Sequence, residues 1–277
     1  MKPAHEIWGR LLLFSFGAAA CVLVYLFLLN FQPTGKNSQT AGLIPAVILA
    51  VSTASLTAWF LRADQLSPAT LGLTAANRPL AHLGVGFLAG SVMTGLWLLI
   101  VAFAAGATWH LNPKIAAVGV LMACGFAFFN NAGEELVYRG YAFVRLADRW
   151  GEAATVVITS GIFAVLHLQA GLPWLSVLAV VFTTGLVFGA TFARWRSLPL
   201  TLGMHVATNI VQEATGLRPS PASMIIPEYQ VAAATAGPIL YTGIATLNLA
   251  VALGILLIGR RSRGARLNRQ ARQSRPP

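Results

Sequence analysis

The strongest constraint in this sequence is a series of apolar segments long enough to cross a lipid bilayer. Hydrophobic residues make up 56% of the 277 residues and charged residues only 10%, whereas soluble domains carry roughly 25% charged residues. A helix needs about 20 apolar residues to span the hydrocarbon core. The chain is therefore predicted to be an all-α, polytopic membrane helix bundle with about eight transmembrane helices and no soluble domain. The predicted spans are Leu11–Leu29, Leu43–Leu61, Leu83–Ala105, Ile115–Val137, Ala153–Leu168, Trp174–Phe192, Leu198–Val211 and Ile239–Ile258, the fifth and seventh being the shortest or most polar.

Basic residues are divided unequally between the two sides of such a bundle. If both termini lie on one side, that side holds 16 of the 19 Lys and Arg residues, and seven of these 16 lie between Arg260 and Arg275. Lys36, Lys114 and Arg218 are left for the other side. Cytoplasmic loops carry the excess of Lys and Arg in membrane proteins. Both termini are therefore predicted to be cytoplasmic.

The net charge of +11 is explained by this topology and requires no nucleic acid. We predict a single transmembrane domain over residues 1–259, followed by a disordered, arginine-rich cytoplasmic tail over residues 260–277. A basic tail of this kind binds anionic lipids with roughly 1 kcal/mol per basic residue. The first apolar segment is long, so it is interpreted as an uncleaved span rather than a signal peptide.

Two adjacent acids, Glu134 and Glu135, stand at the end of the fourth predicted span. One acid at the centre of a membrane helix costs roughly 2.5–3.5 kcal/mol. The chain has only 8 acids in total, and nothing structural requires two of them in lipid. The pair therefore indicates a functional site.

Further polar residues interrupt the fifth and seventh spans at helical spacing. Residues four apart share a helix face, so Phe163 lies beside His167, and His205 and Asn209 form one polar stripe. Glu135 and Arg139 have the same spacing, in the order that favours an ion pair. If the chain turns at Trp150-Gly151, Glu134 and His167 each lie about 24 Å from the turn. These two residues can then face each other at one level. His205 lies about 13 Å in from the cytoplasmic edge at Arg196 by the same rise per residue, so the site is predicted in the cytoplasmic half of the membrane.

Three short motifs resemble those of a known family. They are Glu-Glu-x-x-x-Arg at 134–139, Phe-x-x-x-His at 163–167 and His-x-x-x-Asn at 205–209. In this order, on successive helices, they resemble the motifs of the CAAX prenyl protease and bacteriocin-processing (CPBP, or Abi) family of intramembrane glutamic endopeptidases. Each motif alone is weak, but three in order are a specific signal. The motif core extends over about residues 115–215.

The resemblance implies a role for each motif residue. Glu134 is expected to be the general base that activates water, and His167 to hold that water. Glu135 is expected to pair with Arg139 and support the site together with Phe163. His205 and Asn209 are expected to donate hydrogen bonds to the oxyanion of the tetrahedral intermediate. No acyl-enzyme and no cofactor are implied.

Two other readings of these residues stay open. Two histidines and a glutamate are a sufficient set for a catalytic zinc, so the enzyme could depend on a metal. The same acids could instead serve as a proton relay in a non-enzymatic transporter or immunity protein. Chelation separates the two enzyme readings, and peptide cleavage by the purified protein separates an enzyme from a carrier.

The sequence also suggests a substrate class and a cellular location. The substrate is expected to be a membrane-associated peptide or protein that enters from the cytoplasmic leaflet. The bias toward Ala, Gly and Arg suggests the plasma or inner membrane of a bacterium, which makes prenylated substrates a weaker expectation.

Overall fold

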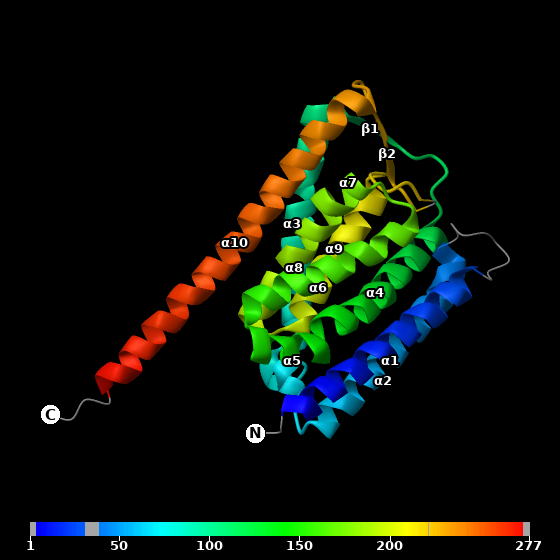
Figure 1. Cartoon of the computed structure of the whole chain (residues 1–277). Helices are drawn as coiled ribbons and strands as arrows, with labels where there is room; N and C mark the ends of the chain where they lie inside the picture. Colours follow the sequence, from blue (N-terminus) through cyan, green and yellow to red (C-terminus); the bar gives the residue numbers. More distant parts are fainter. Residues whose placement is uncertain (1–3, 31–38, 221, 274–277) are drawn as a thin grey trace.

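The computed structural model is a bundle of long helices (Figure 1). It describes residues 4–30, 39–220 and 222–273. Each of the predicted apolar segments lies within a helix, apart from one or two residues at an end, although several of the helices are longer than the segments. The segment Trp174–Phe192 lies within the continuous run of α7, η4 and α8. The helices are α1 (Ala4–Asn30), α2 (Gln39–Ala63), η1 (Pro68–Leu71), η2 (Ala75–Asn77), α3 (Pro79–Ala105), α4 (Ala117–Arg139), α5 (Tyr141–Trp150), α6 (Glu152–His167), η3 (Leu168–Ala170), α7 (Trp174–Ser176), η4 (Val177–Phe182), α8 (Thr183–Trp195), α9 (Leu198–Ala214) and α10 (Ala233–Gln273).

Five helices in the described part of the chain are long and apolar enough to cross a membrane: α1, α2, α3, the α7–α8 run and α10. The others predicted to span are α4, α6 and α9. Helices α6 and α9 have only 16 and 17 residues, and α4 carries the polar cluster around Glu134. The fold is thus a multi-pass helical bundle. The count of eight spans and the cytoplasmic position of both termini stay predictions.

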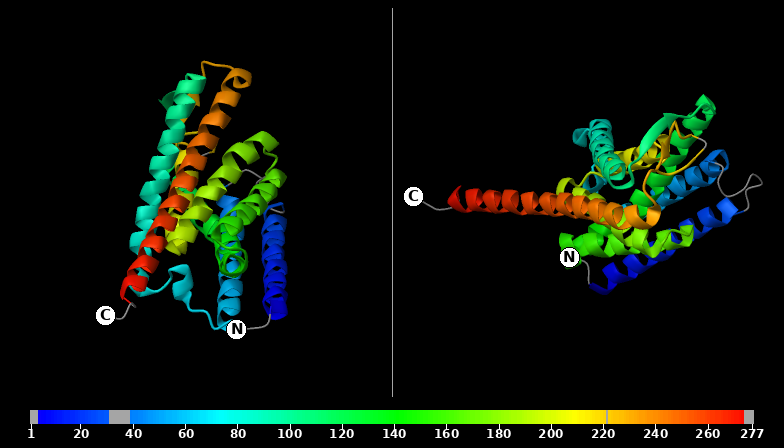
Figure 2. Two further views of the ribbon diagram at one scale, coloured as in Figure 1. Left: turned by 60° about the vertical axis from the view of Figure 1, so that its left-hand side comes forward. Right: turned by 90° about the horizontal axis from the view of Figure 1, so that it is seen from above.

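Two apolar clusters hold the bundle together. The first joins α1, α2, α5 and α8 through aromatic side chains that include Phe14, Phe60 and Phe192. The second joins α3, α8, α9 and α10, with Trp97 and Phe188 as its largest members. Figure 2 shows α3 and α10 side by side, on the far side of the molecule from α1. Helix α9 contributes to both clusters, through Leu198 and Met204.

Helices α3 and α9 approach each other at backbone distance. A Cβ atom added to Gly86 would lie 2.0 Å from the carbonyl oxygen of Leu200, and one added to Gly203 would lie 2.1 Å from that of Leu83. Small residues are what allow such contact between membrane helices. Ser197 is the N-cap of α9, and its side chain accepts a hydrogen bond from the backbone N–H of Leu200. The position of α9 is thus fixed from its first turn.

We expect Gly86→Ala to destabilise the protein by about 1–3 kcal/mol, because its methyl group would force the two helices apart. Gly84→Ala is the matched control on the same helix, since a Cβ atom there meets nothing within 4 Å. Thermal unfolding in detergent measures both. Equal midpoints for the two variants would show that the close packing of α3 on α9 does not contribute to stability.

The connection between α4 and α6 differs from the single hairpin assumed in the sequence prediction. The chain does turn at Gly151, whose φ is 79°, but α5 is a separate helix that begins after a second break at Gly140. A Cβ atom at Gly140 would lie 2.1 Å from the carbonyl oxygen of Leu136. The break therefore requires glycine, and α5 folds back as a short amphipathic helix.

A buried carboxylate ties this segment to the N-terminal helices. Asp64, at the end of α2, accepts hydrogen bonds from the Tyr141 hydroxyl at 2.7 Å and from Arg145 Nε at 2.7 Å, and it also pairs with Arg10 of α1. Burial, together with the hydrogen bond to Asp64, raises the pKa of Tyr141 to about 12. Asp64 thus links α1, α2 and α5 at the end of the bundle that contains the turn at Gly151.

The segment 212–238 is irregular only in part. Helix α9 continues to Ala214, and β2 (Ile225–Glu228) pairs antiparallel with β1 (Thr108–Leu111). Helix α10 then begins at Ala233 and contains Pro238.

The C-terminal part of the chain also differs from the sequence prediction. Helix α10 continues to Gln273, through most of the region predicted as a disordered tail, and its C-terminal half runs away from the other helices (Figure 1). Residues 274–277 of the predicted tail lie outside the described residues. The division of the chain into a domain and a tail stays a prediction.

Candidate active site

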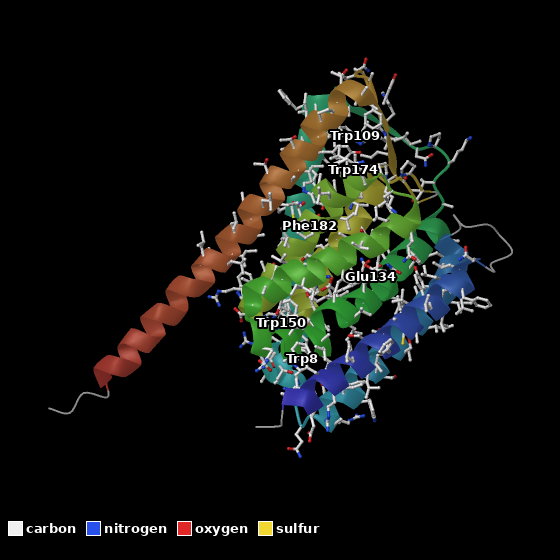
Figure 3. The ribbon with its side chains drawn as sticks, viewed as in Figure 1. Trp8, Trp109, Glu134, Trp150, Trp174 and Phe182 are labelled. Carbon is white, nitrogen blue, oxygen red and sulfur yellow. The ribbon has the colours of Figure 1, made fainter. Side chains whose placement is uncertain are left out.

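Tryptophans lie toward both ends of the bundle, and Glu134 lies between them (Figure 3). Trp8 and Trp150, whose rings are 5.2 Å apart, mark one end, and Trp109 and Trp174 lie toward the other. Tryptophan is enriched at both membrane interfaces. This arrangement is consistent with a site at membrane depth, and its place in the cytoplasmic half stays a prediction.

The expected ion pair of Glu135 with Arg139 is present and completely buried. Arg139 Nη1 donates to Glu135 Oε1 at 3.0 Å, and both side chains have 0% exposure. Arg139 Nη2 also donates to the backbone carbonyl of Gly185 at 3.1 Å. The guanidinium lies over the rings of Phe163 and Phe188 at 5.2 and 5.7 Å from their centroids. Arg139 therefore links α4 to α8 and α6 and is enclosed by protein.

Glu134 has a different environment from its neighbour. Its side chain is 21% exposed, and its Oε1 accepts a hydrogen bond from Asn130 Nδ2 at 2.7 Å. Its Oε2 lies 3.7 Å from Nε2 of His205. Two carboxylates adjacent in sequence thus divide into one that is buried against a cation and one that is accessible.

His205 stands between these two acids. Its Nδ1 donates to Glu135 Oε1 at 2.9 Å, while its Nε2 faces Glu134. The ring is buried and packs against Phe163 and Phe188, with centroid distances of 5.8 and 4.8 Å. Helix α9 therefore brings its histidine directly onto the acidic pair of α4, as the three motifs require.

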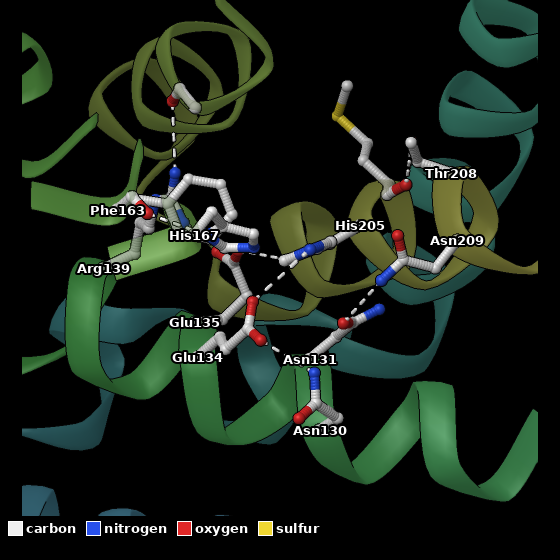
Figure 4. A network of polar contacts seen from close by, with 12 residues as sticks. Asn130, Asn131, Glu134, Glu135, Arg139, Phe163, His167, His205, Thr208 and Asn209 are labelled. Carbon is white, nitrogen blue, oxygen red and sulfur yellow. Dashed lines mark hydrogen bonds and ion pairs between the residues drawn. The ribbon is translucent and has the colours of Figure 1, made fainter. Parts of the chain in front are cut away.

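His167 reaches the same group of residues through Phe163. Its Nδ1 donates to the backbone carbonyl of Phe163 at 2.7 Å, and the two rings are 4.4 Å apart. Because a carbonyl only accepts, the Nε2 of a neutral His167 carries the lone pair. Phe163 contacts both histidines, so the second motif joins the first and third around one aromatic ring (Figure 4).

Asn209, the last predicted residue, contacts a residue that the sequence prediction missed. Its Nδ2 donates to Oδ1 of Asn131 at 2.8 Å. Asn130 and Asn131 precede Glu134 and Glu135 by four residues each, so helical spacing alone could have placed them on the face of the two acids. The close-up in Figure 4 shows both asparagines beside the acids.

Two further observations limit the extent of the site. Glu213, one turn beyond Asn209 on α9, is buried and lies 3.7 Å from Arg218. Within residues 4–30, 39–220 and 222–273, no group of three or more His, Cys, Asp or Glu side chains could hold a metal ion.

The motif residues from Glu134 to Asn209 all lie in a segment that matches a known protein family. Residues 116–211 match the Type II CAAX prenyl endopeptidase Rce1-like family. The resemblance predicted from the three motifs is confirmed at the level of this family. The Rce1-like segment covers α4 to α9, about a third of the chain, and leaves α1–α3 and α10 outside. No curated protein and no solved structure matches the chain.

The Rce1-like match supports a CAAX-type membrane protease and therefore a peptide hydrolase. A family of this kind acts on membrane-associated peptides or proteins. Together with the apolar helices, the match indicates a multi-pass membrane protein.

Proposed function

We propose that this protein is an intramembrane glutamic endopeptidase in which Glu134 activates a water molecule. The observation that carries the proposal is the difference between the two acids. Glu135 is enclosed and neutralised by Arg139, whereas Glu134 is partly exposed and held by one amide hydrogen bond. A general base must reach its water within hydrogen-bond distance, and Glu134 is the acid that is accessible.

The proposed reaction uses no covalent intermediate. Water attacks the substrate carbonyl carbon and passes a proton to Glu134, while the carbonyl oxygen becomes an oxyanion. When the tetrahedral intermediate collapses, the C–N bond breaks and the proton is delivered to the departing amine. His167 is proposed to hold the attacking water through its Nε2 lone pair, because its Nδ1 is engaged with Phe163.

His205 is proposed to act on the oxyanion from Nε2. Since its Nδ1 donates to Glu135, Nε2 can donate only when the ring is an imidazolium. A protonated His205 makes the sum of charges on Glu134, Glu135, Arg139 and His205 zero, which suits a site at membrane depth. Asn209 supplies a second donor from the next turn of α9. Such preorganised donors contribute about 10²–10³ in kcat each.

We expect His205→Ala and Asn209→Ala each to lower kcat by about 10²–10³ with a smaller change in KM, as for groups that act on the transition state. Steady-state kinetics on a fluorogenic membrane peptide measure both constants. A variant whose KM rises while kcat is unchanged would show that the residue only binds substrate.

The proposed substrate is a membrane-associated peptide or protein, and the proposed location is a bacterial plasma membrane. Purified protein in liposomes, incubated with lipid-anchored peptides, should produce new peptide ends detectable by mass spectrometry. A folded preparation that transports protons or solutes but produces no new ends would favour the carrier reading instead.

The proposed chemistry needs no metal ion, and a chelator tests this separately. We expect full activity after dialysis against EDTA and 1,10-phenanthroline. If chelation stops cleavage and added zinc restores it, the metal-dependent alternative holds. His167 and His205 would then be reassigned as ligands rather than as water-holding and oxyanion groups.

A further inference from the structure

The amide of Asn209 has a defined partner on α4. Its Nδ2 donates to Oδ1 of Asn131 at 2.8 Å, across the interface between α9 and α4 (Figure 4). Asn131 has 0% exposure, and Asn209 is half-buried. The neighbouring Asn130 makes the corresponding contact with Glu134 at 2.7 Å. The two asparagines therefore hold two different groups of the proposed site.

The contact with Asn131 decides which face of the Asn209 amide is presented to a substrate. A carboxamide has a donating –NH₂ end and an accepting C=O end, and a half-turn about its last torsion exchanges them. Only the –NH₂ end can stabilise an oxyanion. With one N–H bound by Asn131 Oδ1, the other N–H of Asn209 stays available, and the carbonyl end is kept away from that position.

The second polar atom of Asn131 points to a group outside the chain. Its Nδ2 is buried and has no hydrogen-bond partner among the residues that the structure describes. Buried N–H groups are almost always paired, with protein or with ordered water. A packing role alone would be served better by an apolar residue of similar size. The unpaired N–H is explained if an ordered water occupies the site during the reaction.

We propose that Asn131 is a positioning residue that orients the Asn209 amide for oxyanion stabilisation. This rests on the proposed function. Asn131 acts through Asn209, whereas Asn130 acts on the opposite component of the site, the general base Glu134. The adjacent asparagines on α4 thus serve the two halves of the same chemical step.

A double-mutant cycle tests this role. Asn131→Ala should lower kcat by at least about tenfold with little change in KM, and the Asn131→Ala/Asn209→Ala double variant should be no slower than Asn209→Ala alone. Residues that act as a unit show this non-additivity. The control pair is Asn130→Ala with Asn209→Ala, in which the two losses should multiply because they affect different groups.

Asn131→Leu, which keeps the volume of the side chain, is measured alongside in case Asn131→Ala does not fold, and thermal unfolding of each variant is recorded. Multiplying losses for Asn131 and Asn209 would overturn the proposal and leave Asn131 a structural residue. So would wild-type kcat in a folded Asn131→Leu protein. Failure of wild-type protein to cleave any peptide would instead overturn the proposed function, and this inference with it.

Discussion

Glu134→Gln is expected to reduce peptide cleavage to background while the protein still inserts and folds. Glutamine keeps the size of the side chain and its oxygen can still accept the hydrogen bond from Asn130, but it cannot take a proton from water. Because the side chain is partly exposed and the buried Glu135–Arg139 pair is left intact, the thermal midpoint should change little. Initial rates and unfolding midpoints of purified protein measure both effects.

The matched control is Glu228→Gln, the same substitution at an acid of β2. The side chain of Glu228 is 66% exposed and pairs with His110, which is also exposed. This variant should cleave at the wild-type rate. If Glu134→Gln also cleaves normally, Glu134 is not the base and the proposed mechanism is wrong.

Glu135→Gln is expected to lower both stability and activity. The Glu135–Arg139 pair has 0% exposure on both sides, and removing one partner of a buried pair costs about 3–5 kcal/mol, because the remaining charge is uncompensated. The same substitution weakens the hold on His205, whose Nδ1 donates to Glu135. Thermal unfolding should show a clear loss, accompanied by a lower kcat.

The double variant Glu135→Gln/Arg139→Met separates the two effects. Removing both charges should restore much of the stability, because no charge is left unpaired in the interior. Activity should stay low, because His205 Nδ1 no longer has the Glu135 carboxylate as its hydrogen-bond acceptor. A Glu135→Gln protein as stable as the wild type would contradict the account of this pair.

The parts of the fold that follow from local patterns could be predicted from the sequence. The lengths of the apolar segments predicted where the long helices lie. The i,i+4 spacing of Glu135 and Arg139 predicted that they pair on one helix face. The turn that was assumed at Trp150-Gly151 is present at Gly151. These features depend on residues near one another in the chain, where helix geometry alone fixes the contacts.

What could not be predicted depends on how helices pack. The bond from Asn209 to Asn131 requires a particular register of α9 against α4, two helices that are not adjacent in the chain. The break at Gly140 needs glycine because a Cβ atom there would lie 2.1 Å from the carbonyl oxygen of Leu136. Pairing of β1 with β2 joins segments more than a hundred residues apart. None of these has a local signature strong enough to be read from the residues alone.

The central claim, direct attack by a water that Glu134 activates, is tested by cleavage in water labelled with oxygen-18. After many turnovers the released peptide should carry the label in its new carboxyl group, and mass spectrometry of the enzyme's own α4 fragment should find Glu134 unlabelled. Label in the Glu134 carboxyl group would contradict the account, because it would mean that Glu134 attacks the substrate itself and is regenerated by water.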